Sequence, residues 1–358
     1  IHSPMTQPTD LQLLVRLVHC GHIEEQPAKQ MAQRLQAGEE LDELLIESGH
    51  ESEWVERMRR TGAFETPEIP GYEILGRLGT GGTADVFRAR DKRSQQQLAL
   101  KVLNRKSTLH APTRKSFIKE AQLLEGLKHS GLVGGKGVAK SGETFFSRME
   151  LIEGKTLLEI LDDGTALEEA AALRVVLDVS EVLRYLHEEG VIHRDVKPGN
   201  IMLSHEGRIK LIDLGFAARE HSAAASEDSA VGTVAYLSPE QARGGAEADL
   251  RSDIYSLGVT LFQLVVGRLP FESSDDREVL RMQIMDSLSS PELKGRNFTP
   301  HLNYFLSKMM AKDKQERYQS WPELVEDIGG KLEGFAGLDY GHRRKSRPRS
   351  RGKSDGSR

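Results

Sequence analysis

Residues 193–201 read His-Arg-Asp-Val-Lys-Pro-Gly-Asn-Ile, and this run places three kinds of functional group on one short stretch of chain. Asp195 supplies a carboxylate, which can act as a general base when it lies within hydrogen-bond reach of a proton. Lys197 supplies a cation for an anionic substrate group. Asn200 supplies a neutral amide oxygen, a ligand that suits the hard cation Mg²⁺. Packing alone does not explain this combination, so we interpret the run as part of an active site.

The run resembles the catalytic loop of protein kinases, H-R-D-L-x-x-x-N, with Val196 in place of the usual Leu. The resemblance implies that Asp195 accepts the proton of a substrate hydroxyl and that Lys197 contacts the transferred phosphoryl group. It also implies that Asn200 binds Mg²⁺. A His-Arg-Asp triplet alone also occurs in solvated turns, and it is the Asn five residues after Asp195 that favours the kinase interpretation.

A glycine-rich stretch upstream matches the loop that covers the phosphates of ATP in this family. Missing side chains let backbone N–H groups approach phosphate oxygens closely. Ala84 stands where the family has its third glycine, and the stretch taken by itself is equally consistent with a plain hairpin turn. The resemblance assigns ATP binding to Leu78, Gly79, Thr80, Gly81, Gly82, Thr83, Ala84, Asp85 and Val86.

Two further residues predict a buried ion pair near the phosphates. Lys101 ends the apolar run 98–101, which resembles V-A-I-K on the third strand of kinases, where the Lys reaches the α- and β-phosphates. Such a Lys needs a carboxylate to orient it, and Glu120 is the candidate because it lies in a segment with helical spacing of apolar residues. Without the other motifs, Lys101 would be an ordinary strand-edge residue and Glu120 an exposed helix residue.

The remaining nucleotide contacts follow from the same resemblance. Asp213 ends an apolar strand in a motif similar to D-F-G, with Leu214 for Phe, and would bind the Mg²⁺ that bridges the β- and γ-phosphates. The predicted cofactors are ATP and Mg²⁺, with Mn²⁺ as an alternative ion. The adenine is expected between the lobes against Leu78, Val86, Ala99, Met149 and Met202, with the backbone of Glu150 to Ile152 as hinge.

Residues near 233–240 indicate which kind of hydroxyl group accepts the phosphoryl group. Lys197 and Thr233 match the Ser/Thr kinases, in which the Thr hydrogen-bonds near the base, and the surrounding sequence is similar to the eukaryotic-like Ser/Thr kinases of bacteria. Residues 238–240 resemble the A-P-E motif, and Arg317 is the expected partner of Glu240. Residues 252–258 resemble the buried central helix of the second lobe.

Arg194 suggests regulation, because an Arg before the catalytic Asp binds a phosphate on the activation segment in this family. We predict autophosphorylation at one or more of Ser222, Ser226 and Ser229; the alternative is a loop rich in Ser and Ala that is simply flexible.

The predicted function is therefore a Ser/Thr protein kinase acting on protein substrates, with an α+β bilobal fold over 72–332, divided into an N-lobe (72–152, an antiparallel sheet with one helix) and a C-lobe (153–332). One rival is a pseudokinase that binds ATP as a scaffold. The other is a small-molecule kinase, which the 232–240 motifs disfavour.

Residues 1–66 have a different character: four short amphipathic runs, each followed by a glycine, predict a small helical module joined to the kinase by a linker at 67–71. Leu11, Leu14, Val15 and Val18 are expected to form one apolar face. The module would serve docking or self-association, or would merely pack on the N-lobe.

The C-terminal end of the chain differs from the rest in its net charge. Residues 343–358 carry a net charge of +7, which leaves −12 for the rest of a chain whose total is −5. We predict that 333–358 is a basic, disordered tail that contacts no specific nucleic acid. A single Cys excludes an internal disulfide, and no run is apolar enough to span a membrane, so the expected location is cytoplasmic. Membrane attachment would require that the native chain continue past the tail.

Overall fold

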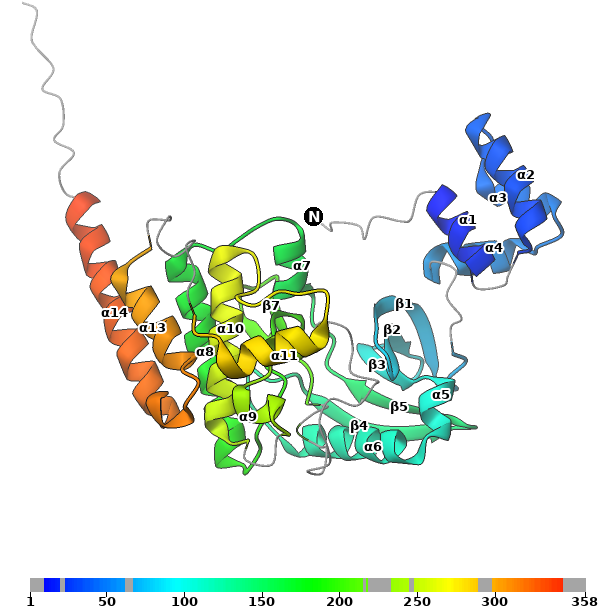
Figure 1. The fold of residues 1–358 in the computed structure, drawn as a ribbon. Helices are drawn as coiled ribbons and strands as arrows, with labels where there is room; N and C mark the ends of the chain where they lie inside the picture. Colours follow the sequence, from blue (N-terminus) through cyan, green and yellow to red (C-terminus); the bar gives the residue numbers. More distant parts are fainter. Residues whose placement is uncertain are drawn as a thin grey trace, which may run out of the picture. The chain divides into compact units, whose positions relative to one another are not determined.

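The structure is a computed structural model that describes residues 10–19, 23–61, 67–214, 217, 233–244, 248–288 and 298–343. The described residues before Gly154 form one compact unit, and those from Gly154 onward form a second. The two units are described in turn, and Figure 1 labels their helices and strands.

The first unit begins with a module of four helices, as predicted from the four amphipathic runs that are each followed by a glycine. The helices are α1 (Asp10–His19), α2 (Glu25–Gln36), α3 (Leu41–Glu47) and α4 (Ser52–Thr61). Gly38 and Gly49 follow α2 and α3 with φ of 95° and 98°, a left-handed conformation that glycine adopts without a steric penalty. The module has its own apolar core, formed by Leu13, Leu14, Leu17, Ile23, Ala28, Met31, Leu41, Leu44, Leu45, Val55 and Met58.

The predicted apolar face of α1 is wrong in part. Leu14 is buried, but Leu11 and Val15 are 51% and 62% exposed, and the side chains that enter the core are those of Leu13 and Leu17 instead. Apolar residues occupy most of the circumference of α1, so the helical period of the sequence does not select one face.

The remainder of the first unit is a five-stranded antiparallel sheet in the order β1-β2-β3-β5-β4. Its strands are β1 (Tyr72–Thr80), β2 (Ala84–Asp91), β3 (Gln97–Leu103), β4 (Gly135–Ser141) and β5 (Thr144–Met149). Alternate residues point to opposite faces of each strand. One face packs Phe87, Leu98, Leu100 and Phe146 into a core, and on the other Ala84 and Leu103 pack with Phe117 of a helix.

This helix is α6 (Ala111–Gly126), which carries Glu120. The prediction of a single helix beside the sheet is incomplete, because a short helix, α5 (Arg105–Leu109), precedes α6. The side chain of Asn104 caps α5 by accepting a hydrogen bond from the Ser107 N–H at 2.8 Å. An α+β composition with an antiparallel sheet is therefore confirmed for this part of the chain.

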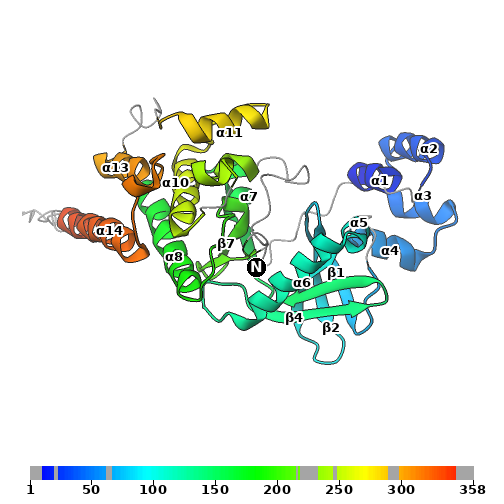
Figure 2. The same ribbon diagram turned by 60° about the horizontal axis from the view of Figure 1, so that its bottom comes forward.

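The second unit is mainly helical. A small sheet joins β6 (Gly154–Thr156), β7 (Ile201–Ser204) and β8 (Ile209–Leu211), in that order. The helices are α7 (Leu157–Asp162), α8 (Glu169–Glu188), α9 (Pro239–Ala242), α10 (Leu250–Val266), α11 (Asp276–Met285), α13 (Pro300–Met309) and α14 (Trp321–Arg343), and there are 3-10 turns η1 (Pro198–Asn200), η2 (Thr233–Tyr236) and η3 (Lys314–Glu316). Figure 2 gives a second view of the same helices.

Helix α10 is the centre of this unit, as the sequence predicts. All of its residues from Ser252 to Val266 are buried. A Cβ atom at Gly258 would lie 2.8 Å from the Cβ of Met309, so glycine permits the close packing of α13 on α10.

Helix α14 continues to Arg343, so the prediction of disorder from residue 333 is wrong for residues 333–343. Apolar residues recur at 332, 335 and 338 in the sequence, a spacing compatible with a helix, whereas the basic run begins only at residue 343. Among the described helices, none combines the length and the apolar character needed to cross a membrane.

Candidate active site

The glycine-rich stretch forms the turn between β1 and β2. The Gly81 N–H donates to the Ala84 carbonyl oxygen at 2.9 Å, and a Cβ atom at Gly81 would lie 3.0 Å from that same oxygen. Ala84 itself is 5% exposed and packs against Leu103 and Phe117. Alanine at this position is therefore a core residue of β2. Beside the turn, Asp85 forms an ion pair with Arg77 at 2.5 Å.

Strand pairing places four predicted nucleotide contacts on one face of the first sheet. Val86 lies opposite Lys101, and Ala99 lies opposite Met149. Lys101 and Ala99 are two residues apart on β3, and directly paired residues share a face, so all four side chains point to the same side. Leu78 lies on β1 and is 42% exposed.

Lys101 and Glu120 form the ion pair that the sequence predicts. The distance from Lys101 Nζ to Glu120 Oε1 is 2.6 Å, and the two side chains are only 15% and 11% exposed. Lys101 is held on β3 and Glu120 on α6, so the contact joins the sheet to its helix. Limited access to water strengthens the attraction relative to a surface pair.

The expected hinge follows β5. The Glu150 N–H donates to the Gly134 carbonyl oxygen at 2.8 Å, and the Gly134 N–H donates to Glu150 Oε2 at 2.9 Å. This reciprocal pair fixes the backbone at the end of β5 and uses the Glu150 N–H. The Glu150 carbonyl oxygen and the backbone of Ile152 are then the hinge groups expected to form hydrogen bonds with the adenine.

In the second unit, Asp195 is the centre of a hydrogen-bonded cluster. Its Oδ2 lies 2.8 Å from Lys197 Nζ and 2.9 Å from Asn200 Nδ2, and the Asn200 amide also donates to the Asp195 carbonyl oxygen at 2.8 Å. Asp195 is only 8% exposed. Burial raises the pKa of its carboxyl group, and the charge of Lys197 opposes that rise.

Asn200 and Asp213 fit a magnesium ion by the chemistry of their donor atoms. Both N–H groups of the Asn200 amide are used on Asp195, which leaves the amide oxygen as the atom that can face a cation. The Asn200 carbonyl accepts the Ile212 N–H at 3.0 Å, so Asp213 follows a residue that is tied to Asn200. Mg²⁺ is commonly held by one or two such oxygens together with substrate phosphates and water.

Asp253 of α10 shapes the loop that holds Asp195, and our sequence analysis did not identify it. Its carboxylate accepts the N–H groups of His193 at 2.9 Å and Arg194 at 2.7 Å. Arg194 has a φ of 66°, an unusual value for a non-glycine residue, and the contact with Asp253 holds that conformation. Asp253 is the one acidic residue of α10, and this was the signal available in the sequence.

His193 supports the same loop in its neutral form. The side chain is fully buried, and burial lowers its pKa to about 4. Its Nδ1 accepts the Asp195 N–H at 3.2 Å, so the ring proton of the neutral form lies on Nε2. His193 therefore fixes the backbone of Asp195 without adding a charge beside it.

A comparison with protein families matches residues 72–327 to the protein kinase domain. The chain belongs to the protein kinase family. The kinase match covers both the sheet with Lys101 and the loop with Asp195, and an α+β kinase fold is thereby established.

Three bacterial proteins are among the relatives of this kinase domain. It is 34% identical over 258 residues to the probable serine/threonine-protein kinase CPE1738 of Clostridium perfringens, covering 72% of this chain and 38% of the relative. It is 34% identical over 273 residues to the probable serine/threonine-protein kinase SCO3848 of Streptomyces coelicolor, covering 74% and 40%. It is 33% identical over 264 residues to the serine/threonine-protein kinase PknB of Mycolicibacterium smegmatis, covering 72% and 42%. The aligned kinase region spans less than half the length of each of these relatives.

The predicted pair of Glu240 and Arg317 is present in the kinase. Arg317 Nη1 and Nη2 donate to Glu240 Oε1 and Oε2 at 2.8 and 2.9 Å, and the Arg side chain has no exposed area. Glu240 lies on α9, which begins with a capping box between Ser238 and Gln241. The Gln241 amide donates to the Arg194 carbonyl oxygen at 3.0 Å, so α9 is also tied to the catalytic loop.

Other predicted residues of the kinase are placed only in part. Met202 lies on β7, paired with Lys210 and Thr156. The backbone of Thr233 begins η2. Ser222, Ser226 and Ser229 lie outside the described residues.

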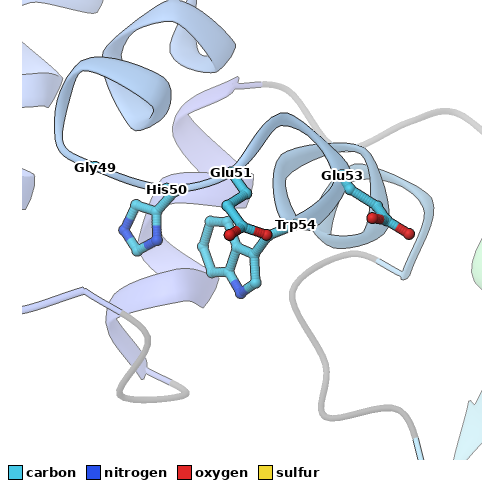
Figure 3. A pocket seen from close by; sticks show the side chains of 5 residues that line it. All are labelled: Gly49, His50, Glu51, Glu53 and Trp54. Atoms are coloured by element: carbon cyan, nitrogen blue, oxygen red, sulfur yellow. The ribbon is translucent and has the colours of Figure 1, made fainter.

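A pocket of about 380 Å³ lies on the helical module, and none of the predicted site residues lines it. It is lined by Gly49, His50, Glu51, Glu53 and Trp54, whose side chains are labelled in Figure 3. The rings of His50 and Trp54 stack with centroids 4.0 Å apart.

Proposed function

We propose that this chain transfers the γ-phosphoryl group of Mg-ATP to serine or threonine hydroxyls of proteins. The observation that carries the proposal is the cluster in which Lys197 and Asn200 both hold the buried carboxylate of Asp195. Such a carboxylate, oriented by two donors, suits a base for a substrate hydroxyl. The names of the bacterial relatives, all serine/threonine-protein kinases, support the same activity.

Each of the predicted site residues then has a defined task in the proposal. Asp195 would orient the acceptor hydroxyl and take its proton, while Lys197 would stabilise negative charge on the transferred group. Lys101, directed by Glu120, would bind the α- and β-phosphates. Asn200 and Asp213 would hold Mg²⁺, which supplies charge neutralisation for the phosphates when bound. Val86, Ala99 and Met149 would give the adenine an apolar surface.

The choice of acceptor can be measured directly. We expect incubation of the chain with radiolabelled Mg-ATP and dephosphorylated casein to yield phosphoserine and phosphothreonine after acid hydrolysis. A Lys101→Met variant should lose most of this labelling, because it removes the cation that positions the phosphates. Leu109→Met, at an exposed position of α5, is the control. Predominant phosphotyrosine would contradict the assignment, as would ATP binding without any transfer to protein.

Regulation by autophosphorylation is part of the same proposal. Arg194 would bind a phosphate added at Ser222, Ser226 or Ser229, since a guanidinium forms charge-assisted hydrogen bonds with phosphate oxygens. The backbone of Arg194 is already fixed by Asp253, so its side chain starts from a defined position.

Mass spectrometry tests this regulation. After incubation with Mg-ATP we expect phosphate on at least one of Ser222, Ser226 and Ser229, and a triple Ser→Ala variant should phosphorylate casein more slowly than the wild-type chain. Ser48→Ala, in the helical module, is the control for a lost hydroxyl. An unmodified segment in a fully active enzyme would contradict the proposal.

The helical module would provide docking or self-association. Leu11 and Val15 are exposed one turn apart on α1, which supports a contact surface at that position. Cytoplasmic action, free or attached to a membrane through chain beyond the basic run, belongs to the same proposal and is supported by the charge of 343–358.

A further inference from the structure

Turn η2, which begins at Thr233, is held by buried side chains from two different helices. From α10, Ser256 Oγ donates to the Tyr236 carbonyl oxygen at 2.7 Å, and Gln263 Oε1 accepts the Tyr236 hydroxyl at 2.5 Å. From α11, the Gln283 amide donates to the Ala235 carbonyl oxygen. Two consecutive carbonyl groups of one turn are therefore fixed by side chains of separate helices.

Gln283 is unusual among the residues of α11, because it is polar and has no exposed area. Its Nε2 is used on Ala235, and its Oε1 accepts the Tyr255 hydroxyl at 2.5 Å. Burying an amide costs free energy unless both its donor and its acceptor find partners. The two contacts together satisfy that requirement and leave the amide one orientation.

Lys312 holds both Tyr255 and Gln283 through hydrogen bonds. Its Nζ donates to the Tyr255 hydroxyl at 2.8 Å and to the Gln283 main-chain oxygen at 2.7 Å, and it lies 4.4 Å from the centre of the Phe271 ring. The carbonyl oxygen of Gln283 lies in the last turn of α11, where a cation is electrostatically favourable. Lys312 thus holds both the end of α11 and the hydroxyl that orients the Gln283 side chain.

We propose that Gln283 is a positioning residue for the protein substrate: it holds η2 on α11 and thereby places the backbone that follows Thr233. The inference rests on the proposed kinase function, in which the segment from 232 to 240 receives the protein substrate. Ser256 and Gln263 hold only Tyr236, and they do so from the buried helix α10. Gln283 makes the hydrogen bond with Ala235, and through this contact α11 holds the first of the two fixed carbonyl groups of η2.

The main test replaces Gln283 by a side chain of similar volume without hydrogen-bonding groups. In Gln283→Met we expect the KM for dephosphorylated casein to rise about tenfold, because the Ala235 carbonyl loses its buried donor. The KM for ATP should change less than about twofold, since Gln283 is not proposed to contact the nucleotide. A merely structural role would change both constants or the amount of folded enzyme.

Thr260→Val is the matched control. Thr260 is fully buried on α10 and donates to the Ser256 carbonyl oxygen at 2.9 Å, so its replacement also removes one buried hydrogen bond. Within the described residues, no hydrogen bond joins the Thr260 side chain to η2. The proposal is overturned if the casein KM of Gln283→Met equals that of Thr260→Val.

A second measurement does not depend on catalysis. Amide hydrogen exchange over 233–237 should be faster in Gln283→Met than in Thr260→Val. Equal exchange rates in the two variants would overturn the positioning role. If Gln283→Met does not fold, Tyr255→Phe removes only the hydroxyl that orients the amide, and it should give a smaller rise in casein KM and the same exchange signature. A wild-type chain that never labels casein would refute the proposed function itself, whereas the exchange result would still report on Gln283.

Discussion

Replacing Asp195 by asparagine should lower the rate of phosphoryl transfer to casein by about a thousandfold or more. A positioned general base contributes roughly 10²–10⁴-fold to such a rate, and asparagine cannot accept the proton. The substitution also removes the negative charge that holds Lys197 at 2.8 Å, so the cation next to the transferred group loses its orientation. The measurement is single-turnover transfer from radiolabelled ATP, with the KM for ATP determined in parallel.

The structure predicts that this variant stays folded. Burial raises the pKa of Asp195, so the charged carboxylate is itself costly in the fold, and a neutral amide avoids that cost. Its oxygen can still accept from Asn200. Asp178→Asn on α8 provides a control with the same chemical change, and it should retain wild-type transfer. Transfer by Asp195→Asn within about tenfold of wild type would show that Asp195 is not the base.

The sequence predicted the parts of the site that short motifs encode. Lys101 and Glu120 were paired from the resemblance of 98–101 to the kinase motif and from the helical spacing of apolar residues around Glu120, and their 2.6 Å contact confirms the pairing. The pair of Glu240 and Arg317 was predicted in the same way across 77 positions of sequence, and it is also present. In both cases the resemblance to protein kinases indicated the partner, and a buried charge requires an opposite one.

Contacts that depend on packing were not predictable in this way. Asp253 supports the backbone of His193 and Arg194, and Gln283 supports Ala235, yet in the sequence each is only one of several polar residues in its helix. Their partners are backbone groups, which every residue possesses, so no sequence motif identifies them. The prediction of the buried face of α1 failed in part for a related reason, since only the neighbouring helices decide which of its apolar residues are buried.

Replacing Glu240 by glutamine should destabilise the second unit by about 3–5 kcal/mol, the cost typical of removing one partner from a buried ion pair. Arg317 would keep its charge in a site with no exposed side-chain area. The glutamine oxygen could accept from one Arg nitrogen, but its NH₂ group would face the other donor. Three main-chain carbonyls, those of Ala311, Arg251 and Lys312, also accept from Arg317 and moderate the loss without removing it. Urea unfolding of both chains measures the difference.

Glu181→Gln is the matched control, because Glu181 pairs with Arg184 at the surface with 44% and 41% exposed side chains, and its loss should cost at most about 1 kcal/mol. The pH dependence separates an ion pair from a packing defect. Burial alone would raise the pKa of Glu240, but hydrogen bonds and charge from Arg317 lower it below the usual 4.5. A depressed pKa contributes stability above that value, which is lost as pH falls through the folded pKa. The gap between wild type and Glu240→Gln should therefore narrow below pH 4.5, and a gap that stays constant on acidification would show that the charge of Glu240 is not what stabilises α9.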